Sequence, residues 1–99
     1  MDPVLSPAVT AKLREYMRGN VEMVYGAGNF PGLTVCAKSG TSQLGGDLTS
    51  NAMFAGYVTD PEYPQAVICV DENGGYCASA CVPVVSRVLD ACKTVLDAE

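Results

Sequence analysis

Residues 35–43 read VCAKSGTSQ, and the wider segment Leu33–Gln43 is the first of three predicted β-strands. It begins with Thr, Val and Cys, residue types that fit a pleated and partly buried surface. Two further apolar segments, Asn51–Thr59 and Gln65–Asp71, follow it. The links between the three segments are short, which favours antiparallel hairpins over helical crossovers. The sequence therefore predicts a three-stranded antiparallel meander.

A helix is predicted before these strands. Ser6 followed by Pro7 is typical of a helix start, because Ser can cap free backbone N–H groups and Pro has no N–H to leave unpaired. The helix should end before the turn-forming segment Gly26–Asn29. Its apolar residues, which recur at helical spacing, are Val9, Leu13, Tyr16 or Met17, Val21 and Val24.

A second helix is predicted from about Ser79, with Pro83 in its first turn. The residues expected to face a core are Val84, Val88, Ala91 or Cys92, and Val95. The order of helix, three strands and helix indicates an α+β fold in a single domain over residues 1–99. The middle strand, which is almost wholly apolar, is expected to be buried on both faces.

Composition excludes several classes of function. The 99 residues are 48% hydrophobic, enough for one compact domain and too few for two. Only 17% are charged, the net charge is −5, and no stripe of Lys or Arg could neutralise phosphates, so no nucleic-acid partner is expected. No apolar run approaches the ~20 residues of a membrane span, and the start of the chain does not read as a targeting segment.

The five cysteines favour no metal or cofactor. Their number is odd, no pair has C-x2-C spacing, and the chain has no His. Burial as small hydrophobic residues is the favoured interpretation over a redox or metal-binding protein. The cysteines are Cys36, Cys69, Cys77, Cys81 and Cys92.

Lys38 stands out in the first strand because its neighbours Val35–Ala37 are apolar. Taken alone, the motif Lys38–Thr41 has a structural explanation. A lysine on an edge strand discourages edge-to-edge aggregation, and Gly40 could mark a bulge.

In context, the chain resembles the serine-type penicillin-binding proteins over nearly its whole length. VCAKSGTSQ is similar to their third signature, K-[TS]-G-T-x-Q, on the strand that lines the active site. Order and spacing match together, which is far more specific than one motif, and imply part of a penicillin-binding-protein or β-lactamase-like transpeptidase fold. The other matching segments are MRGNVE (Met17–Glu22), AMFAGY (Ala52–Tyr57, similar to F-x-G-[FY]), QAVICV (Gln65–Val70, similar to the last strand) and ENGG (Glu72–Gly75, before a Pro-bearing helix).

The resemblance implies a role for each residue of the motif. Lys38 would lie near the catalytic serine, where its charge stabilises developing negative charge and helps to hold a substrate carboxylate. Ser39 would offer its hydroxyl to the same carboxylate. Gly40, without a side chain, would let the acyl-donor peptide add as a β-strand. The backbone N–H of Thr41 would form half of the oxyanion hole and contact the same substrate. Gln43 matches the trailing Gln of the signature and carries no implied role.

Two signatures of the family are missing. Its nucleophile motif is S-x-x-K, but the residues three before Lys12, Lys38 and Lys93 are Val, Val and Asp. Its S-x-N motif should precede Lys38, and Thr49–Asn51, which has a similar look, comes after it. A covalent mechanism needs a nucleophile and an activating base within hydrogen-bond reach. The chain alone is therefore expected to be inactive.

The resemblance thus implies the C-terminal segment of a D,D-transpeptidase that cross-links peptidoglycan stem peptides through an acyl-serine and binds β-lactams. The expected partners are the stem peptide, β-lactams and the remainder of the transpeptidase domain. The parent protein would act on the outer face of the cytoplasmic membrane. The alternative is a natural non-catalytic module of the same fold that binds peptides or itself. The edge of the Gln65–Asp71 strand would be bare in isolation, so a homo-oligomer is expected.

Overall fold

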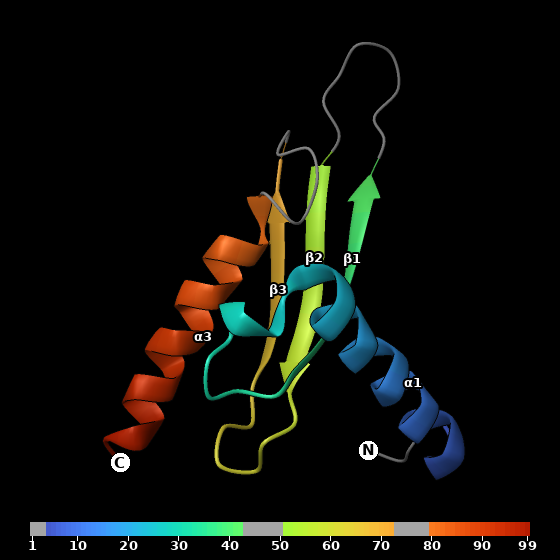
Figure 1. Cartoon of the computed structure of the whole chain (residues 1–99), viewed down its shortest axis with the longest axis horizontal. Helices are drawn as coiled ribbons and strands as arrows, with labels where there is room; N and C mark the ends of the chain where they lie inside the picture. Colours follow the sequence, from blue (N-terminus) through green and yellow to red (C-terminus); the bar gives the residue numbers. More distant parts are fainter. Residues whose placement is uncertain (1–3, 43–50, 73–79) are drawn as a thin grey trace.

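Three antiparallel strands and two helices, with two short helical turns, make up the structure (Figure 1), a computed structural model that describes residues 4–42, 51–72 and 80–99. Predictions for Gln43, Cys77 and the helix start at Ser79 fall outside these residues. The elements are α1 (Pro7–Asn20), the π-helical turn η1 (Val21–Tyr25), the 3-10 turn η2 (Ala27–Asn29), β1 (Val35–Ser42), β2 (Asn51–Val58), β3 (Ala66–Asp71) and α3 (Val82–Asp97).

The sheet is the predicted meander, with strand order β1-β2-β3 and antiparallel pairing throughout. Lys38 lies opposite Ala55 and Gly40 opposite Met53, and this register runs through β1 without interruption. Gly40 is therefore not a bulge. Of the structural explanation of the motif, only the lysine on an edge strand remains. The α+β prediction is confirmed, and the strand ends lie within two residues of the predicted ones.

Helix α1 begins as predicted, because the Ser6 Oγ accepts a hydrogen bond from the Val9 N–H at 3.3 Å. Helical structure continues through η1 and ends at Gly26, whose φ of 90° places it in the region that favours glycine. Of the apolar residues that recur at helical spacing here, Val21 is fully buried and Met17 is half-buried. The N-terminal part of α1 extends away from the sheet (Figure 1), which leaves its apolar residues exposed: Val9, Leu13 and Tyr16. Val24, in the η1 turn, is also exposed.

The predicted core face of α3 is wrong. The buried residues are Val82, Val85 and Leu89, whereas the predicted Val84, Val88, Ala91, Cys92 and Val95 are exposed. Lys93 explains why the prediction failed, because this charged residue continues the face of α3 that Val82, Val85 and Leu89 form. A lysine stem can cover apolar surface while its charge stays in water.

Lys93 anchors the end of α3 to the turn between β2 and β3. Its ammonium lies 5.0 Å from the centroid of the Tyr63 ring and 3.0 Å from an Asp97 carboxylate oxygen. The Tyr63 hydroxyl donates to the other Asp97 oxygen. The hydrogen bond from Tyr63, and to a smaller extent the one from Lys93, holds the pKa of Asp97 below its ordinary value of 3.8. A Cβ on Gly32 would lie 3.0 Å from the Lys93 Cε, so the stem packs closely on this glycine.

The main core cluster lies on one face of the sheet. Phe54, which is 1% exposed, lies at its centre, with the Tyr25 ring 5.4 Å away and the Phe30 ring 6.5 Å away. The other face of β2 carries Met53, which is 38% exposed, and the exposed Ala55. The prediction that the middle strand is buried on both faces is therefore wrong for the part of the chain that the structure describes.

The cysteines are mostly interior. Cys36 and Cys81 are buried and Cys69 is half-buried, as the favoured interpretation predicted, but Cys92 is exposed. Within the described ranges, no group of three His, Cys, Asp or Glu residues is placed to hold a metal ion. Among these same residues, no helix has the length and apolar character of a membrane span.

Candidate functional site

The β1 outer edge, formed by the backbone groups of Val35, Ala37, Ser39 and Thr41, lies on the side of the strand that faces away from β2. Alternate residues of an antiparallel strand direct their N–H and C=O groups to the same side. Val35, Ala37 and Ser39 use these groups to bond side chains of α1 and η1 instead of another strand. Thr41 follows in the same alternation, so its N–H and C=O also point outward.

Three side chains cover the first half of this edge. The Arg18 Nη1 donates to the Val35 carbonyl at 2.8 Å, and the Asn20 Nδ2 donates to the Ala37 carbonyl at 2.9 Å. The Tyr25 hydroxyl accepts the Ser39 N–H at 2.7 Å. Edge groups that are already paired cannot take up another strand. The covered part of the edge therefore ends at the N–H of Ser39.

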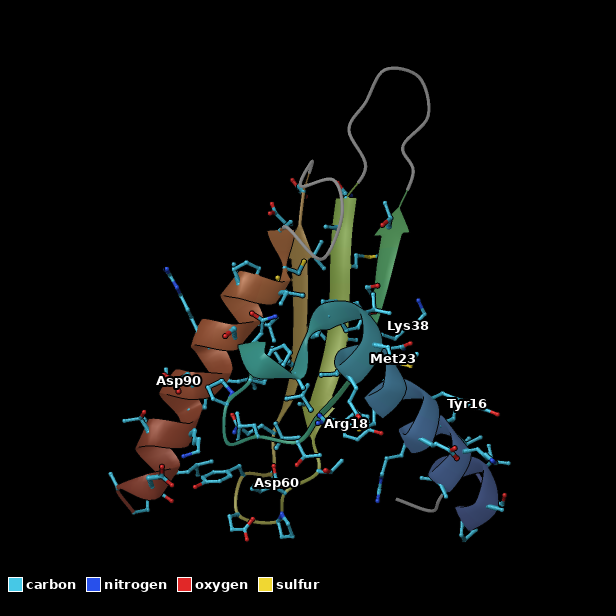
Figure 2. All side chains as sticks on the ribbon, in the orientation of Figure 1. Tyr16, Arg18, Met23, Lys38, Asp60 and Asp90 are labelled. Atoms are coloured by element: carbon cyan, nitrogen blue, oxygen red, sulfur yellow. The ribbon has the colours of Figure 1, made fainter. Side chains whose placement is uncertain are left out.

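The second half of the edge is open among the residues that the structure describes. The Lys38 ammonium donates to the Ser39 carbonyl at 2.7 Å, which places a positive charge on the outer edge. The Lys38 side chain projects from β1 on the side away from β2 (Figure 2) and is exposed. For the N–H of Thr41, no acceptor occurs among the described atoms. A cation and a free N–H donor thus lie beside each other.

Ser39 connects the covered and open halves. The Tyr25 hydroxyl donates to the Ser39 Oγ at 2.6 Å in addition to accepting the Ser39 N–H. Ser39 is half-buried, so its hydroxyl remains within reach of a ligand at the edge. The motif residues Lys38, Ser39 and Thr41 therefore present an ammonium, a hydroxyl and a backbone N–H along one short length of strand.

Gly40 is not required by packing. A Cβ at this position would lie 3.4 Å from the terminal methyl of Met53, the flexible end of a side chain, and its φ is not in the glycine region. Gly56 on β2 is different, because its Cβ would lie 3.1 Å from the Cys36 carbonyl oxygen and 3.2 Å from the Ala37 Cβ. The folded chain thus explains Gly56, whereas packing places no such requirement on Gly40.

The uncovered face of the sheet continues from the motif. A shallow hollow of about 300 Å³ lies there. The hollow is lined by Lys38 on one side and by an apolar surface on the other, which includes Ile68 (78% exposed) and Val70 (56% exposed). Its lining residues are Lys38, Ser39, Gly40, Met53, Phe54, Ala55, Ile68 and Val70.

Sequence reasoning missed Arg18, Asn20 and Tyr25. Their contacts depend on how the end of α1 and the η1 turn meet β1, which periodicity does not report. One signal was available: Arg18 and Asn20 are polar residues in the last turn of a helix that precedes β1, a strand with no second neighbour within residues 4–42, 51–72 and 80–99. Backbone groups of such an edge need partners from side chains or water.

Comparison with known proteins gives a consistent result. The family model described as penicillin binding protein transpeptidase domain matches residues 2–90. Comparison with curated protein sequences gives no significant match. A solved structure, the ceftriaxone acyl-enzyme complex of penicillin-binding protein A from M. tuberculosis, superimposes with a TM-score of 0.73 and 28% identity over 89% of this chain and 22% of that chain.

Two further structures of that protein are similar. Its imipenem acyl-enzyme complex gives a TM-score of 0.67 and 25% identity over 100% of this chain and 21% of that chain. Its penicillin G acyl-enzyme complex gives a TM-score of 0.61 and 27% identity over 96% and 21%. The chain therefore spans about a fifth of the length of the solved proteins that it matches.

Proposed function

The chain belongs to the penicillin-binding protein transpeptidase domain family, and we propose that residues 1–99 are the C-terminal part of such a domain. The full-length transpeptidase, meaning the product of the reading frame that contains these residues, cross-links peptidoglycan stem peptides and binds β-lactams. Two facts support this proposal: the chain spans about a fifth of the solved proteins that it matches, and those structures of penicillin-binding protein A are β-lactam acyl-enzyme complexes. With peptidoglycan as substrate, the full-length transpeptidase acts on the outer face of the cytoplasmic membrane.

The observation that carries the proposal is the open half of the β1 outer edge. An acyl-donor peptide adds there as an antiparallel strand beyond Ser39, where Gly40 presents no side chain to obstruct it. The Thr41 N–H donates to the oxygen that becomes negative during acyl transfer, and the second donor is the N–H of the nucleophile. Lys38 supplies positive charge beside that oxygen and the substrate carboxylate.

The nucleophile belongs to another part of the full-length transpeptidase, because no S-x-x-K or S-x-N motif stands in the required place within these 99 residues. The isolated chain should therefore form no covalent adduct with a β-lactam. Intact-mass measurement after incubation with excess labelled penicillin should show only the unmodified chain. One penicillin bound per chain would contradict the assignment of the nucleophile to a different segment.

We also propose that the isolated chain self-associates through β3. Among the described strands, β3 has a neighbour on one side only, and its exposed face carries Ile68 and Val70. An apolar edge of this kind recruits another strand. In the full-length transpeptidase, the remainder of the domain is the partner of this edge. Static light scattering on the isolated chain should give at least the mass of a dimer, and a monomer at high concentration would contradict the proposal.

A further inference from the structure

Tyr25 has a place in the site that its sequence neighbourhood does not reveal. We propose that Tyr25 is a positioning residue that turns the Ser39 hydroxyl into a hydrogen-bond donor for the carboxylate of the acyl donor. This inference rests on the proposed function and extends it to a residue outside the Lys-Ser-Gly-Thr motif. Its evidence is the pair of hydrogen bonds between Tyr25 and Ser39 and the packing that holds the Tyr25 ring.

The Tyr25 ring is held firmly. It is 8% exposed and meets Phe54 edge-on, with ring centroids 5.4 Å apart at an angle of 64°. The Asn29 Nδ2 donates to the Tyr25 carbonyl at 2.8 Å, and Gly26 ends the turn directly after it. A phenol fixed in this way offers its hydroxyl to Ser39 at one position only, so the cost of ordering the two groups is already met by folding.

The directions of the two hydrogen bonds decide which proton is left for a ligand. A phenol hydroxyl carries one proton and accepts with its lone pairs. The Tyr25 oxygen accepts the Ser39 N–H, and its proton goes to the Ser39 Oγ. The Ser39 hydroxyl proton is then free for a third group. A carboxylate can only accept, so it fits this proton, and donation from Tyr25 polarises the Ser39 hydroxyl and strengthens the bond.

The same contacts set where the ligand lies. Tyr25 occupies the Ser39 N–H, so an added strand finds its first free N–H at Thr41. An antiparallel strand runs with its C-terminal end toward Ser39. The acyl-donor carbonyl that accepts from the Thr41 N–H belongs to the bond that is broken. The next residue of the donor carries its terminal carboxylate, which therefore lies beside Ser39 and Lys38. The Ser39 hydroxyl that Tyr25 orients therefore meets this carboxylate.

The first test measures the contact in the isolated chain. Tyr25→Phe removes the hydroxyl and keeps the ring on Phe54. The hydrogen-exchange protection of the Ser39 amide should fall about tenfold, because its acceptor is lost. Tyr16→Phe is the matched control, since Tyr16 is 64% exposed and lies on the preceding helix, and it should change nothing. Unchanged protection at Ser39 in Tyr25→Phe would overturn the inference.

The second test separates positioning from stability in the full-length transpeptidase. Tyr25→Phe should slow acylation by benzylpenicillin about tenfold and leave the slower acylation by its methyl ester, which lacks the carboxylate charge, unchanged. Ser39→Ala, which leaves the Tyr25 ring in place, should give the same selective loss. Adding Tyr25→Phe to Ser39→Ala should cost nothing more, since the two groups act as one unit.

The outcomes distinguish the two proposals. Equal slowing with both compounds, or no slowing with either, would overturn the role of Tyr25 while leaving the proposed function intact. A wild-type protein that neither compound acylates would instead overturn the proposed function, and the carboxylate role with it.

Discussion

Replacing Thr41 with proline is expected to slow acylation of the full-length transpeptidase by penicillin about 10²–10³-fold, the usual cost of one lost oxyanion-hole donor. The substitution removes the Thr41 N–H, which points away from β2 and makes no ladder bond. Proline is tolerated on an edge strand in this orientation. The loss should therefore appear in the rate of acylation, measured by stopped-flow with a fluorescent penicillin, and not in the melting temperature.

Thr41→Ala is the matched control. It keeps the backbone N–H and removes only an exposed side chain. Its acylation rate should stay within about threefold of the wild type, because the proposed donor is still present. If alanine and proline slow the reaction equally, the side chain of Thr41 and not its N–H is the group that matters, and the oxyanion assignment is wrong.

Replacing Phe54 with alanine is expected to lower the free energy of unfolding of the isolated chain by about 3–5 kcal/mol. Phe54 is 1% exposed and meets the rings of Tyr25 and Phe30, so its removal leaves a cavity that the two rings cannot fill. Urea denaturation followed by circular dichroism measures the change. A loss of this size would take much or all of the stability of a domain this small.

Met53→Ala is the control for Phe54, since the two residues are neighbours that point to opposite faces of β2. Met53 is 38% exposed on the uncovered face, and its truncation should cost less than about 1 kcal/mol. Equal losses from the two substitutions would contradict the placement of the core on one face. A larger loss from Met53→Ala would mean that the uncovered face is buried in the isolated chain by self-association.

The strands and their order could be predicted because they depend on local signals. Strand-forming residues of Leu33–Gln43 and Gln65–Asp71, together with short links, leave few arrangements other than a meander. The start of α1 was equally local, since Ser6 and Pro7 act within one turn. Family resemblance added the motif Lys38–Thr41, and the structure places these residues together on one edge.

The buried face of each helix or strand was predicted less well, because it depends on which other element packs against it. Counting apolar residues favoured Val84 and Val88 on α3, but Lys93 completes the buried stripe by laying its stem over Gly32. The middle strand is apolar throughout, so its composition could not reveal that Met53 faces an uncovered surface. Tyr25 escaped for a similar reason, since the η1 turn that aims it at Ser39 follows no 3.6-residue period.

Mapping of the acylated residue tests the central claim most directly. The full-length transpeptidase is incubated with penicillin, digested, and searched for the peptide that carries the acyl group. The account predicts one acylated serine, in an S-x-x-K motif that precedes residue 1 of this chain. An acyl group on any of the 99 residues would contradict the claim that this segment binds and positions the substrate while another supplies the nucleophile.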